Sequence, residues 1–293
     1  MSNMFNELIY FVKDKFPNLC KAKIFGNGIY ARWGKFLNFG DQLTPLILHH
    51  YGFTPIYSQY KPSFGHKADF VCVGTLLQDT PNDFSGIVLG SGMDDVSKNF
   101  SNATILGIRG KLTQKNLNLK DDSVVLGDPG LLVAYIFPEK IDKKWALGII
   151  PHFIDKNENT IALWRQSFGD NVKIIDVQQS PKKVITEIKQ CERIISSSLH
   201  GLIVADAFDI PNVMFTIREN LKRQPNDDHK FKDYYTSLGI DFKGLEPTGL
   251  ETMDYLIDQT SSKGHLVDKM KKELDQVFKN LHSTFKQWKL ENN

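Results

Sequence analysis

Short apolar runs alternate along the chain with segments of helical periodicity. Several runs, including GIVLG and ATILGI, are apolar at consecutive positions. A strand that is apolar on both faces is buried on both faces, which favours a parallel sheet covered by helices. Strands that alternate with helices indicate βαβ units, so the pattern predicts an α/β fold. The predicted strands are residues 23–25, 70–74, 86–89, 104–108, 124–126, 145–150, 173–177, 193–196 and 212–215.

The segments between these runs predict helices. The longest has apolar residues from Leu266 to Trp288 at steps of three and four, which form one stripe along a helix. We expect this C-terminal helix to pack on the body of the protein. The predicted helices are residues 6–15, 42–51, 110–117, 181–190, 199–208, 252–260 and 265–290.

A charged segment at residues 138–144 separates two sets of strands and predicts a polar linker. We therefore expect an N-terminal α/β domain at residues 1–140. A C-terminal α/β domain with the long helix is expected at residues 141–293. Two Rossmann-like domains would face each other across a cleft, where ligands bind beyond the carboxyl ends of the strands.

The composition limits the kinds of molecule that the protein is expected to bind. The 293 residues include 36 basic and 34 acidic ones, and this balance predicts no nucleic-acid partner. The N-terminal segment lacks the apolar core of a signal peptide, and no run approaches the ~20 apolar residues of a membrane span. We expect a cytoplasmic protein and leave open a peripheral contact with the membrane. The three cysteines show no metal-binding spacing, and no metal is expected.

The sharpest chemical signal follows the strand predicted at residues 193–196. Ser196, Ser197 and Ser198 come just before a helix whose first turn contains His200 and Gly201. Backbone N–H groups and the helix dipole make such a start an anion site. Histidine titrates near neutrality and can transfer a proton. The alternative, that the serines cap the helix and the histidine is structural, stays open.

Four more polar residues follow predicted strands or precede predicted helices. Asp41 precedes an apolar helix, and Arg109 follows a strand and offers a bidentate fork for an anion. Asp128 precedes Pro129, and His152 follows the first strand of the second half. Each has a structural alternative: helix cap, surface ion pair, turn former and packing histidine, respectively.

Segments at these positions share a resemblance. The run ISSSLHGLIVADAFDIP at residues 195–211 resembles the C-terminal signature of the polysaccharide pyruvyl transferases. Asn38 and Asp41 stand in a segment similar to that family's N-x-G-D motif. Residues 107–110 resemble its arginine-bearing turn, and residues 126–132 resemble its G-D-P segment. Residues 150–153 and 230–235 resemble further motifs of one branch, so the matches keep their order over most of the chain.

The resemblance implies a two-domain fold like the GT-B glycosyltransferases. It also implies transfer of the enolpyruvyl unit of phosphoenolpyruvate onto two hydroxyls of a sugar in a cell-surface polysaccharide precursor. The products would be a pyruvate ketal and phosphate. Phosphoenolpyruvate would be a co-substrate, so no cofactor is expected, and the saccharide acceptor would be carried on a lipid at the inner face of the membrane.

The resemblance also suggests roles. Arg109 and the turn from Ser196 to Gly201 would bind phosphoenolpyruvate, His200 would transfer protons, and Asp41 would lie near the acceptor. Further substrate-binding candidates are Asn38, Asp128, His152 and Lys230.

The chain departs from the family pattern at one position. Many members carry arginine two positions before the motif histidine, where this chain has Ser198. Lys230, Arg218 and Arg223 are candidates to supply the missing positive charge.

Two alternative functions remain. A GT-B glycosyltransferase would use the same cleft to bind a nucleotide-sugar. A non-catalytic assembly partner is compatible with the loss of arginine at position 198. The joint presence of Asp41, Arg109 and His200 favours an enzyme.

Overall fold

Two parallel β-sheets form the framework of the protein. The computed structural model describes residues 15–34, 38–62, 66–120, 124–217 and 227–292. Every ladder that joins neighbouring strands is parallel. The first sheet has the order β2 (Thr54–Tyr57), β1 (Gly28–Arg32), β3 (Phe70–Val71), β4 (Ile87–Leu89), β5 (Thr104–Ile108) and β6 (Val125–Leu126). The second has the order β11 (Gly244–Leu245), β10 (Asn212–Phe215), β9 (Cys191–Ser196), β7 (Trp145–Ile150) and β8 (Val172–Ile174).

Both sheets follow the same winding rule. In each, the first strand along the chain lies inside, the second lies at the edge, and the later strands add on the other side. The direction of winding therefore reverses between β1 and β3 in one sheet and between β7 and β9 in the other. Crevices open beyond the carboxyl ends of the strands at such reversals, and ligands bind there.

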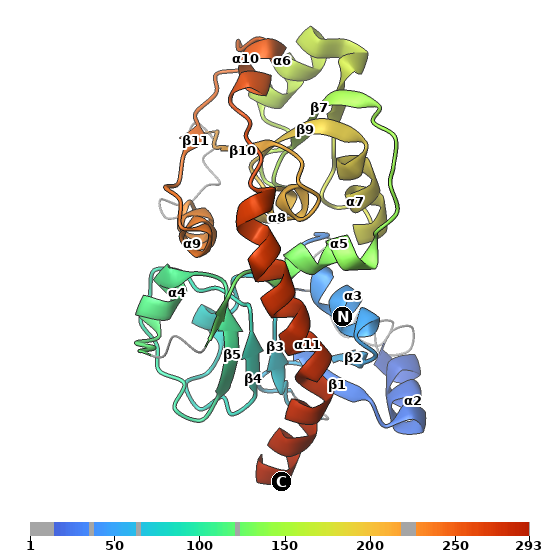
Figure 1. Cartoon of the computed structure of the whole chain (residues 1–293), viewed down its shortest axis with the longest axis vertical. Coiled ribbons are helices and arrows are strands. Elements are labelled where there is room, and N and C mark those ends of the chain that lie inside the picture. The colour runs from blue at the N-terminus through green and yellow to red at the C-terminus, as the bar shows by residue number, and fades with distance from the viewer. Residues whose placement is uncertain (1–14, 35–37, 63–65, 121–123, 218–226, 293) are drawn as a thin grey trace, which may run out of the picture.

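Helices cover the sheets and connect the strands (Figure 1). Six predicted helices are confirmed, with ends that move by a few residues, and the helix predicted at residues 6–15 falls, apart from its last residue, outside the described residues. Four helices, α2, α5, α6 and α9, were not predicted. The helices are α2 (Phe16–Phe25), α3 (Leu43–His50), α4 (Lys111–Asn116), α5 (Val133–Ile136), α6 (Asn159–Phe168), α7 (Pro181–Lys189), α8 (Leu199–Ala207), α9 (His229–Leu238), α10 (Met253–Asp258) and α11 (Gly264–Asn292), with short 3-10 turns η2 (Leu77–Asp79), η3 (Pro129–Leu132) and η4 (Gly169–Asn171).

The strand predicted at residues 23–25 is wrong. These residues form the last turn of α2, which ends at Gly26 in the left-handed conformation with φ of 66°. The Gly26 N–H donates to the carbonyl of Ala22 at 2.9 Å, a common way to end a helix. The first strand is instead β1, where Ile29 and Ala31 are buried and their neighbours are partly exposed.

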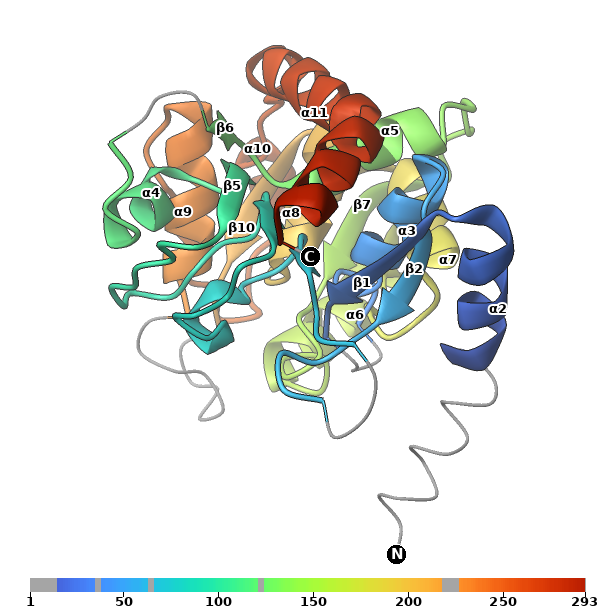
Figure 2. The ribbon, with the colours of Figure 1, turned by 90° about the horizontal axis from the view of Figure 1, so that it is seen from below.

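The long C-terminal helix α11 lies across both sheets (Figures 1 and 2). Its buried stripe includes Leu274, Phe278 and Phe285, as the periodicity predicted. The Phe278 ring stacks on Tyr51 with centroids 5.0 Å apart, and the Tyr51 hydroxyl donates to Asp275 at 2.7 Å. The helix therefore follows the second sheet in the chain but covers the first, which confirms that it packs on the body of the protein.

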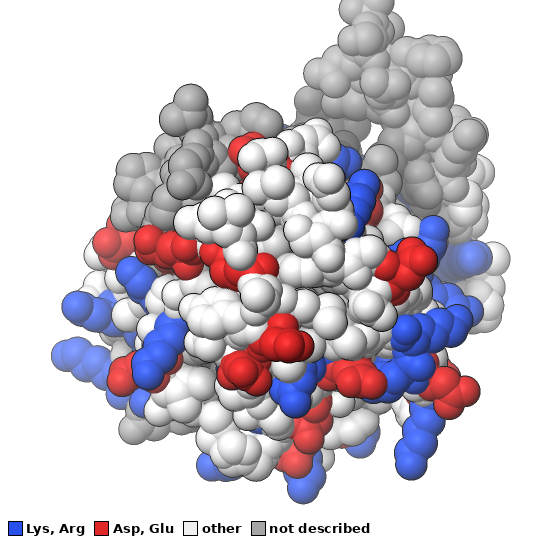
Figure 3. Space-filling view, turned by 90° about the horizontal axis from the view of Figure 1, so that it is seen from above, with Lys and Arg blue, Asp and Glu red and all other residues white. Residues whose placement is uncertain are grey.

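The predicted α/β class is confirmed by two parallel sheets and the long C-terminal helix. The likeness to GT-B glycosyltransferases and the boundary at residue 140 stay predictions. Within the described residues, no helix combines the length and apolar character needed to cross a bilayer. On the face shown in Figure 3, acidic and basic side chains are interspersed, in keeping with the small net charge of +2.

Candidate functional site

The predicted site residues lie where the two sheets meet. In the first sheet, Asp41 follows β1, Arg109 follows β5 and Asp128 follows β6. In the second, His200 follows β9 in the first turn of α8. The Phe39 N–H, beside Asp41, donates to the carbonyl of Val177 at 2.8 Å and so joins the halves. Residues from both sheets thus form one site, although they are far apart in sequence.

Arg109 is fully buried and is held from both sides. Its Nε donates to Asp233 Oδ2 at 3.0 Å, and its Nη1 donates to Thr75 Oγ1 at 2.7 Å. Among the described residues, its Nη2 has no hydrogen-bond partner. Leaving a buried N–H of a charged group without a partner is costly, so this nitrogen is suited to bind an anion.

Asp128 and His200 face each other beside that guanidinium. Asp128 Oδ1 accepts from the Gly130 N–H at 2.8 Å. Asp128 Oδ2 lies 3.8 Å from His200 Nε2, which is longer than a hydrogen bond. Both atoms are buried and lack a hydrogen-bond partner in the described parts of the chain. Because the charge of Arg109 also acts on both Asp128 and His200, three such polar atoms from three elements lie near one another.

Burial controls the protonation of this pair. Burial, reinforced by the positive charges of Arg109, Lys230 and His152, lowers the pKa of His200 to about 3. Burial also raises the pKa of Asp128 to about 6, against the opposing effects of the Gly130 N–H and the Arg109 charge. The imidazole is thus neutral at pH 7, and the carboxyl titrates close to neutrality.

Asp41 is the second carboxyl with a pKa near neutrality. Burial raises its pKa to about 6, while the positive charges of Lys230 and Arg32 act in the opposite direction. Its position follows from a tight turn in which the Asp41 N–H donates to the Asn38 carbonyl at 3.1 Å. Asn38 Oδ1 accepts from the Gly40 N–H at 3.2 Å, so Asn38 shapes the turn that presents Asp41.

Three glycines leave room for the three candidate side chains. A Cβ on Gly92 would come within 2.1 Å of Arg109 Cζ, and one on Gly40 within 2.2 Å of His200 Nδ1. A Cβ on Gly34 would lie 2.5 Å from Asp41 Cγ. Contacts this short do not occur in real structures, so any side chain at these positions would displace a site residue.

The three serines support the backbone of the site. Ser196 Oγ lies 3.0 and 2.8 Å from the carbonyl oxygens of Ile150 and Ser198, which share its one proton, and it accepts from the Ser198 N–H. Ser197 Oγ donates to Asp155 at 2.5 Å and accepts from the His152 N–H at 2.9 Å. Ser198 is the N-cap residue of α8 and makes no side-chain cap bond. Of the three serines, Ser198 is therefore the one whose hydroxyl group does not cap its helix or hold the turn by hydrogen bonds of this kind.

Gly201 and His152 complete the turn. A Cβ on Gly201 would come within 2.5 Å of Ser196 Oγ, so glycine lets α8 pack against the end of β9. His152 follows β7, and its positive charge contributes to the lowered pKa of His200. Both residues lie where the winding of the second sheet reverses.

Lys230 is a cation close to both catalytic candidates. It lies on α9, and its charge lowers the pKa of Asp41 and of His200. It can therefore supply the positive charge that Ser198 lacks. The other two candidates, Arg218 and Arg223, lie outside the described residues.

Sequence reasoning missed two residues that hold the site. Asp233 on α9 is fully buried and binds Arg109, the Thr113 N–H and the Thr113 hydroxyl, at 3.0, 2.9 and 2.6 Å. Arg32 ends β1 and influences Asp41. Arg32 was missed because the first strand was predicted too early in the chain. Asp233 stands in the segment 230–235 that resembles a family motif, but its role could not be predicted, because its partner Arg109 is 124 residues away.

None of the predicted site residues lines the 490 Å³ cavity that lies beside the end of α11. In the described part of the chain, no group of three or more His, Cys, Asp and Glu side chains is placed to hold a metal ion.

Comparison with known proteins identifies a family for the chain. The model of the polysaccharide pyruvyl transferase family matches residues 24–219, more than half of the chain. That stretch contains every predicted site residue except Lys230. It ends before α9, which carries Asp233.

Two relatives give a wider view. An uncharacterized protein, L143, of Acanthamoeba polyphaga mimivirus is 32% identical over 61% of this chain and 63% of its own length. The succinoglycan biosynthesis protein ExoV of Rhizobium meliloti (strain 1021) is 29% identical over 70% of this chain and 63% of its own length. The chain thus spans less than two thirds of either relative, and no solved structure matches it. On the family match and the site residues that it contains, the chain belongs to the polysaccharide pyruvyl transferase family.

Proposed function

We propose that the protein transfers the enolpyruvyl unit of phosphoenolpyruvate onto two hydroxyls of one sugar in a polysaccharide precursor, forming a pyruvate ketal. The observation that carries this proposal is the convergence of Arg109 Nη2, Asp128 Oδ2 and His200 Nε2, all buried and without hydrogen-bond partners among the described residues. Membership of the polysaccharide pyruvyl transferase family and the similarity to a succinoglycan biosynthesis protein support the same function.

The reaction places defined demands on the site. C2 of phosphoenolpyruvate gains bonds to two sugar oxygens, its bond to the phosphate oxygen breaks, and the methylene carbon gains one proton. The two hydroxyls lose two protons in total, of which one balances the new methyl group and the other leaves with phosphate. The enzyme therefore needs anion ligands for two charged groups, together with an acid and a base.

Arg109 is suited to bind the anionic donor. Its guanidinium is held by Asp233 and Thr75, so Nη2 can bind an oxygen of the carboxylate or phosphate without further ordering of the side chain. The start of α8 adds backbone N–H groups, and Lys230 adds a second positive charge. This set compensates for the serine at position 198.

His200 and Asp41 are suited to transfer protons. The neutral imidazole of His200 can accept a proton, and Asp41, with a pKa of about 6, is partly protonated near neutrality and can donate or accept one. A bound trianion raises the pKa of each neighbouring group, because it stabilises their protonated forms. Donor binding would therefore bring His200 towards its ordinary titration range, with Asp128 opposite to orient it. Asp41 would act on the acceptor hydroxyl.

The acceptor forms the second half of the proposal. We infer a saccharide carried on a lipid at the inner membrane face, and no cofactor beyond the co-substrate. The support is the family's name and the presence of a carboxyl, Asp41, beside the donor site. A nucleotide-sugar in place of phosphoenolpyruvate is the competing assignment.

Calorimetric titration with phosphoenolpyruvate and with UDP-glucose tests the proposal. We expect saturable binding of phosphoenolpyruvate and none of UDP-glucose. Arg109→Lys keeps the charge beside Asp233 but loses Nη2, so binding should weaken about tenfold or more. Arg193→Lys is the matched control, because Arg193 bonds Thr260 and none of the site residues.

The outcomes separate the competing functions. Binding of UDP-glucose alone would identify a glycosyltransferase. If neither ligand binds, with or without saccharide acceptors, the non-catalytic role is favoured. Equal affinity of Arg109→Lys and the unaltered protein would remove Arg109 from the donor site.

A further inference from the structure

The 490 Å³ cavity lies at the other end of the first sheet. It is lined by Asp69 and Ser85, just before β3 and β4 begin, whereas the candidate transfer site lies beyond the ends of these strands. Trp288 and Lys289 of α11 close one side, and the Trp288 Nε1–H donates to the Ser85 carbonyl at 2.8 Å. The volume is within the range of about 300–1,000 Å³ that is typical of small-ligand pockets.

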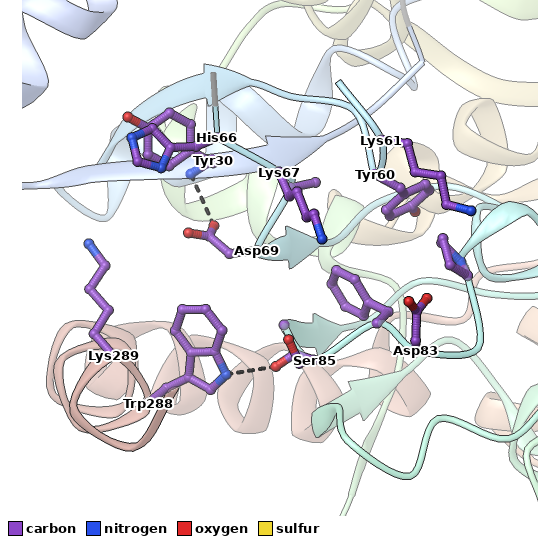
Figure 4. Close-up of a pocket in the computed structure, with 14 residues that line it drawn as sticks. Tyr30, Tyr60, Lys61, His66, Lys67, Asp69, Asp83, Ser85, Trp288 and Lys289 are labelled. Atoms are coloured by element: carbon purple, nitrogen blue, oxygen red, sulfur yellow. Dashed lines mark hydrogen bonds between the residues drawn. The ribbon is translucent and has the colours of Figure 1, made fainter. Parts of the chain in front are cut away.

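Aromatic rings line this cavity on several sides (Figure 4). Tyr30 and His66 form one pair, with ring centroids 4.5 Å apart. Tyr60 and Phe84 form another, edge to face at 5.7 Å, and Trp288 contributes from α11. Rings from four separate parts of the chain thus offer apolar faces and edges to one space.

Charged groups of both signs stand between the rings. Asp69 and Asp83 supply acceptors, and the ammonium groups of Lys61, Lys67 and Lys289 supply donors (Figure 4). Asp69 Oδ1 accepts from the Tyr30 N–H at 3.1 Å, which fixes the orientation of its carboxyl group. Burial raises the pKa of Asp69 to about 7, opposed mainly by the Lys289 charge. A carboxyl kept partly out of water beside rings indicates a ligand that forms hydrogen bonds there.

We propose that this cavity is a saccharide-binding site, separate from the transfer site. A sugar ring has an apolar face that packs on aromatic side chains and hydroxyls that both donate and accept. Rings beside Asp69, Asp83 and three lysines match both properties. The inference rests on this cavity alone and not on the reaction proposed above.

A nucleotide fits the cavity less well. Phosphate groups bind to cations and to the starts of helices, and two carboxylates beside them would repel the ligand. No lining residue belongs to the first turn of a described helix, and the helix that reaches the cavity, α11, does so near its carboxyl-terminal end, where the dipole is negative.

The indole resonance of Trp288 offers a direct test in full-length protein. We would record ¹H–¹⁵N spectra at pH 8, where Asp69 is mostly ionised, during titration with maltotetraose, cellotetraose, galactobiose and tetragalacturonate. Trp288→Phe assigns the Trp288 signal. Trp164, which is buried in the other half and donates to Glu251, serves as the internal reference. We expect a saturable shift of the Trp288 signal with at least one saccharide and no shift of Trp164.

Asp69→Asn tests the polar part of the site. Asparagine keeps an acceptor for the Tyr30 N–H but removes the charge, so saccharide affinity should fall about tenfold or more. Asp142→Asn, at an exposed position far along the chain, should leave affinity unchanged. Phosphoenolpyruvate binding by Asp69→Asn should stay at the unaltered level, so failure here is distinguishable from failure of the proposed reaction.

Three results would overturn the proposal. The first is that none of the four saccharides shifts the Trp288 signal. The second is a shift produced by UDP, titrated in the same way, and by no saccharide, which would identify a nucleotide site. The third is a saccharide affinity that Asp69→Asn does not change.

Discussion

Single residues of the candidate site are controlled mainly by burial. His200 is held neutral, while burial raises the pKa of Asp41 and of Asp128 from 3.8 to about 6. All three shifts favour the uncharged form, because burial removes the water that stabilises charge. A bound anionic substrate favours the protonated forms of all three side chains, so substrate binding and proton uptake should be coupled.

The raised pKa of Asp128 has a defined effect on stability. A pKa that is higher in the folded state gives stability that is complete below about pH 4 and lost as pH rises through about 6. Asp128→Asn removes this contribution and keeps an acceptor for Gly130. Its unfolding free energy should therefore fall less between pH 4.5 and 8 than that of the unaltered protein, by about 2 kcal/mol. Urea unfolding at the two pH values measures the difference.

The control for this prediction is Asp142→Asn, whose side chain is exposed. It should keep the pH dependence of the unaltered protein. The same dependence in Asp128→Asn would mean that Asp128 is already ionised at pH 4.5.

At the scale of elements, α8 and α9 bring the second half of the chain to the site. α8 could be predicted, because a buried strand, a run of serines and an apolar helix follow one another locally. α9 could not be predicted in the same way, because its polar and aromatic residues gave no clear apolar stripe before the packing was known. Its Asp233 meets Arg109 only in the folded chain, and Gly40 next to His200 is equally a product of tertiary structure.

The pair of Asp233 and Arg109 connects α9 to the first sheet. Removing one member of a buried pair leaves the other charge uncompensated, so Asp233→Asn should lower the unfolding free energy by about 3–5 kcal/mol. Asp258→Asn, at an exposed position on α10, should change it by less than about 0.5 kcal/mol. Chemical unfolding of the two variants provides the comparison, and equal stabilities would show that the pair is replaceable.

The strands show which local sequence patterns were sufficient to predict secondary structure. Runs that are apolar on both faces, such as those of β4, β7 and β9, were found correctly. β1 was missed because residues 23–25, which end in the apolar pair Ile24 and Phe25, were predicted as the strand, although they belong to α2, which ends at the left-handed Gly26. Because the predicted strand ended at residue 25 instead of residue 32, Arg32 was not considered as a residue that follows a strand.

For the whole molecule, α11 joins the two sheets along one continuous helix (Figure 1). Phe278 is fully buried and stacks on Tyr51 of the first half. Phe278→Ala should therefore lower the unfolding free energy by about 3–5 kcal/mol. Leu290→Ala, where the side chain is 79% exposed, should have an effect below about 0.5 kcal/mol. Thermal or urea unfolding distinguishes these values, and a small effect of Phe278→Ala would show that α11 is only loosely attached.

The same helix has a consequence for biosynthesis. Tyr51, Phe53 and Ser85 are translated long before their partners Phe278, His282 and Trp288. The first sheet therefore cannot acquire this cover until α11 has been made, and an apolar face stays open until then. Premature termination before residue 264 would leave that face permanently exposed, which marks such products for chaperones and proteases.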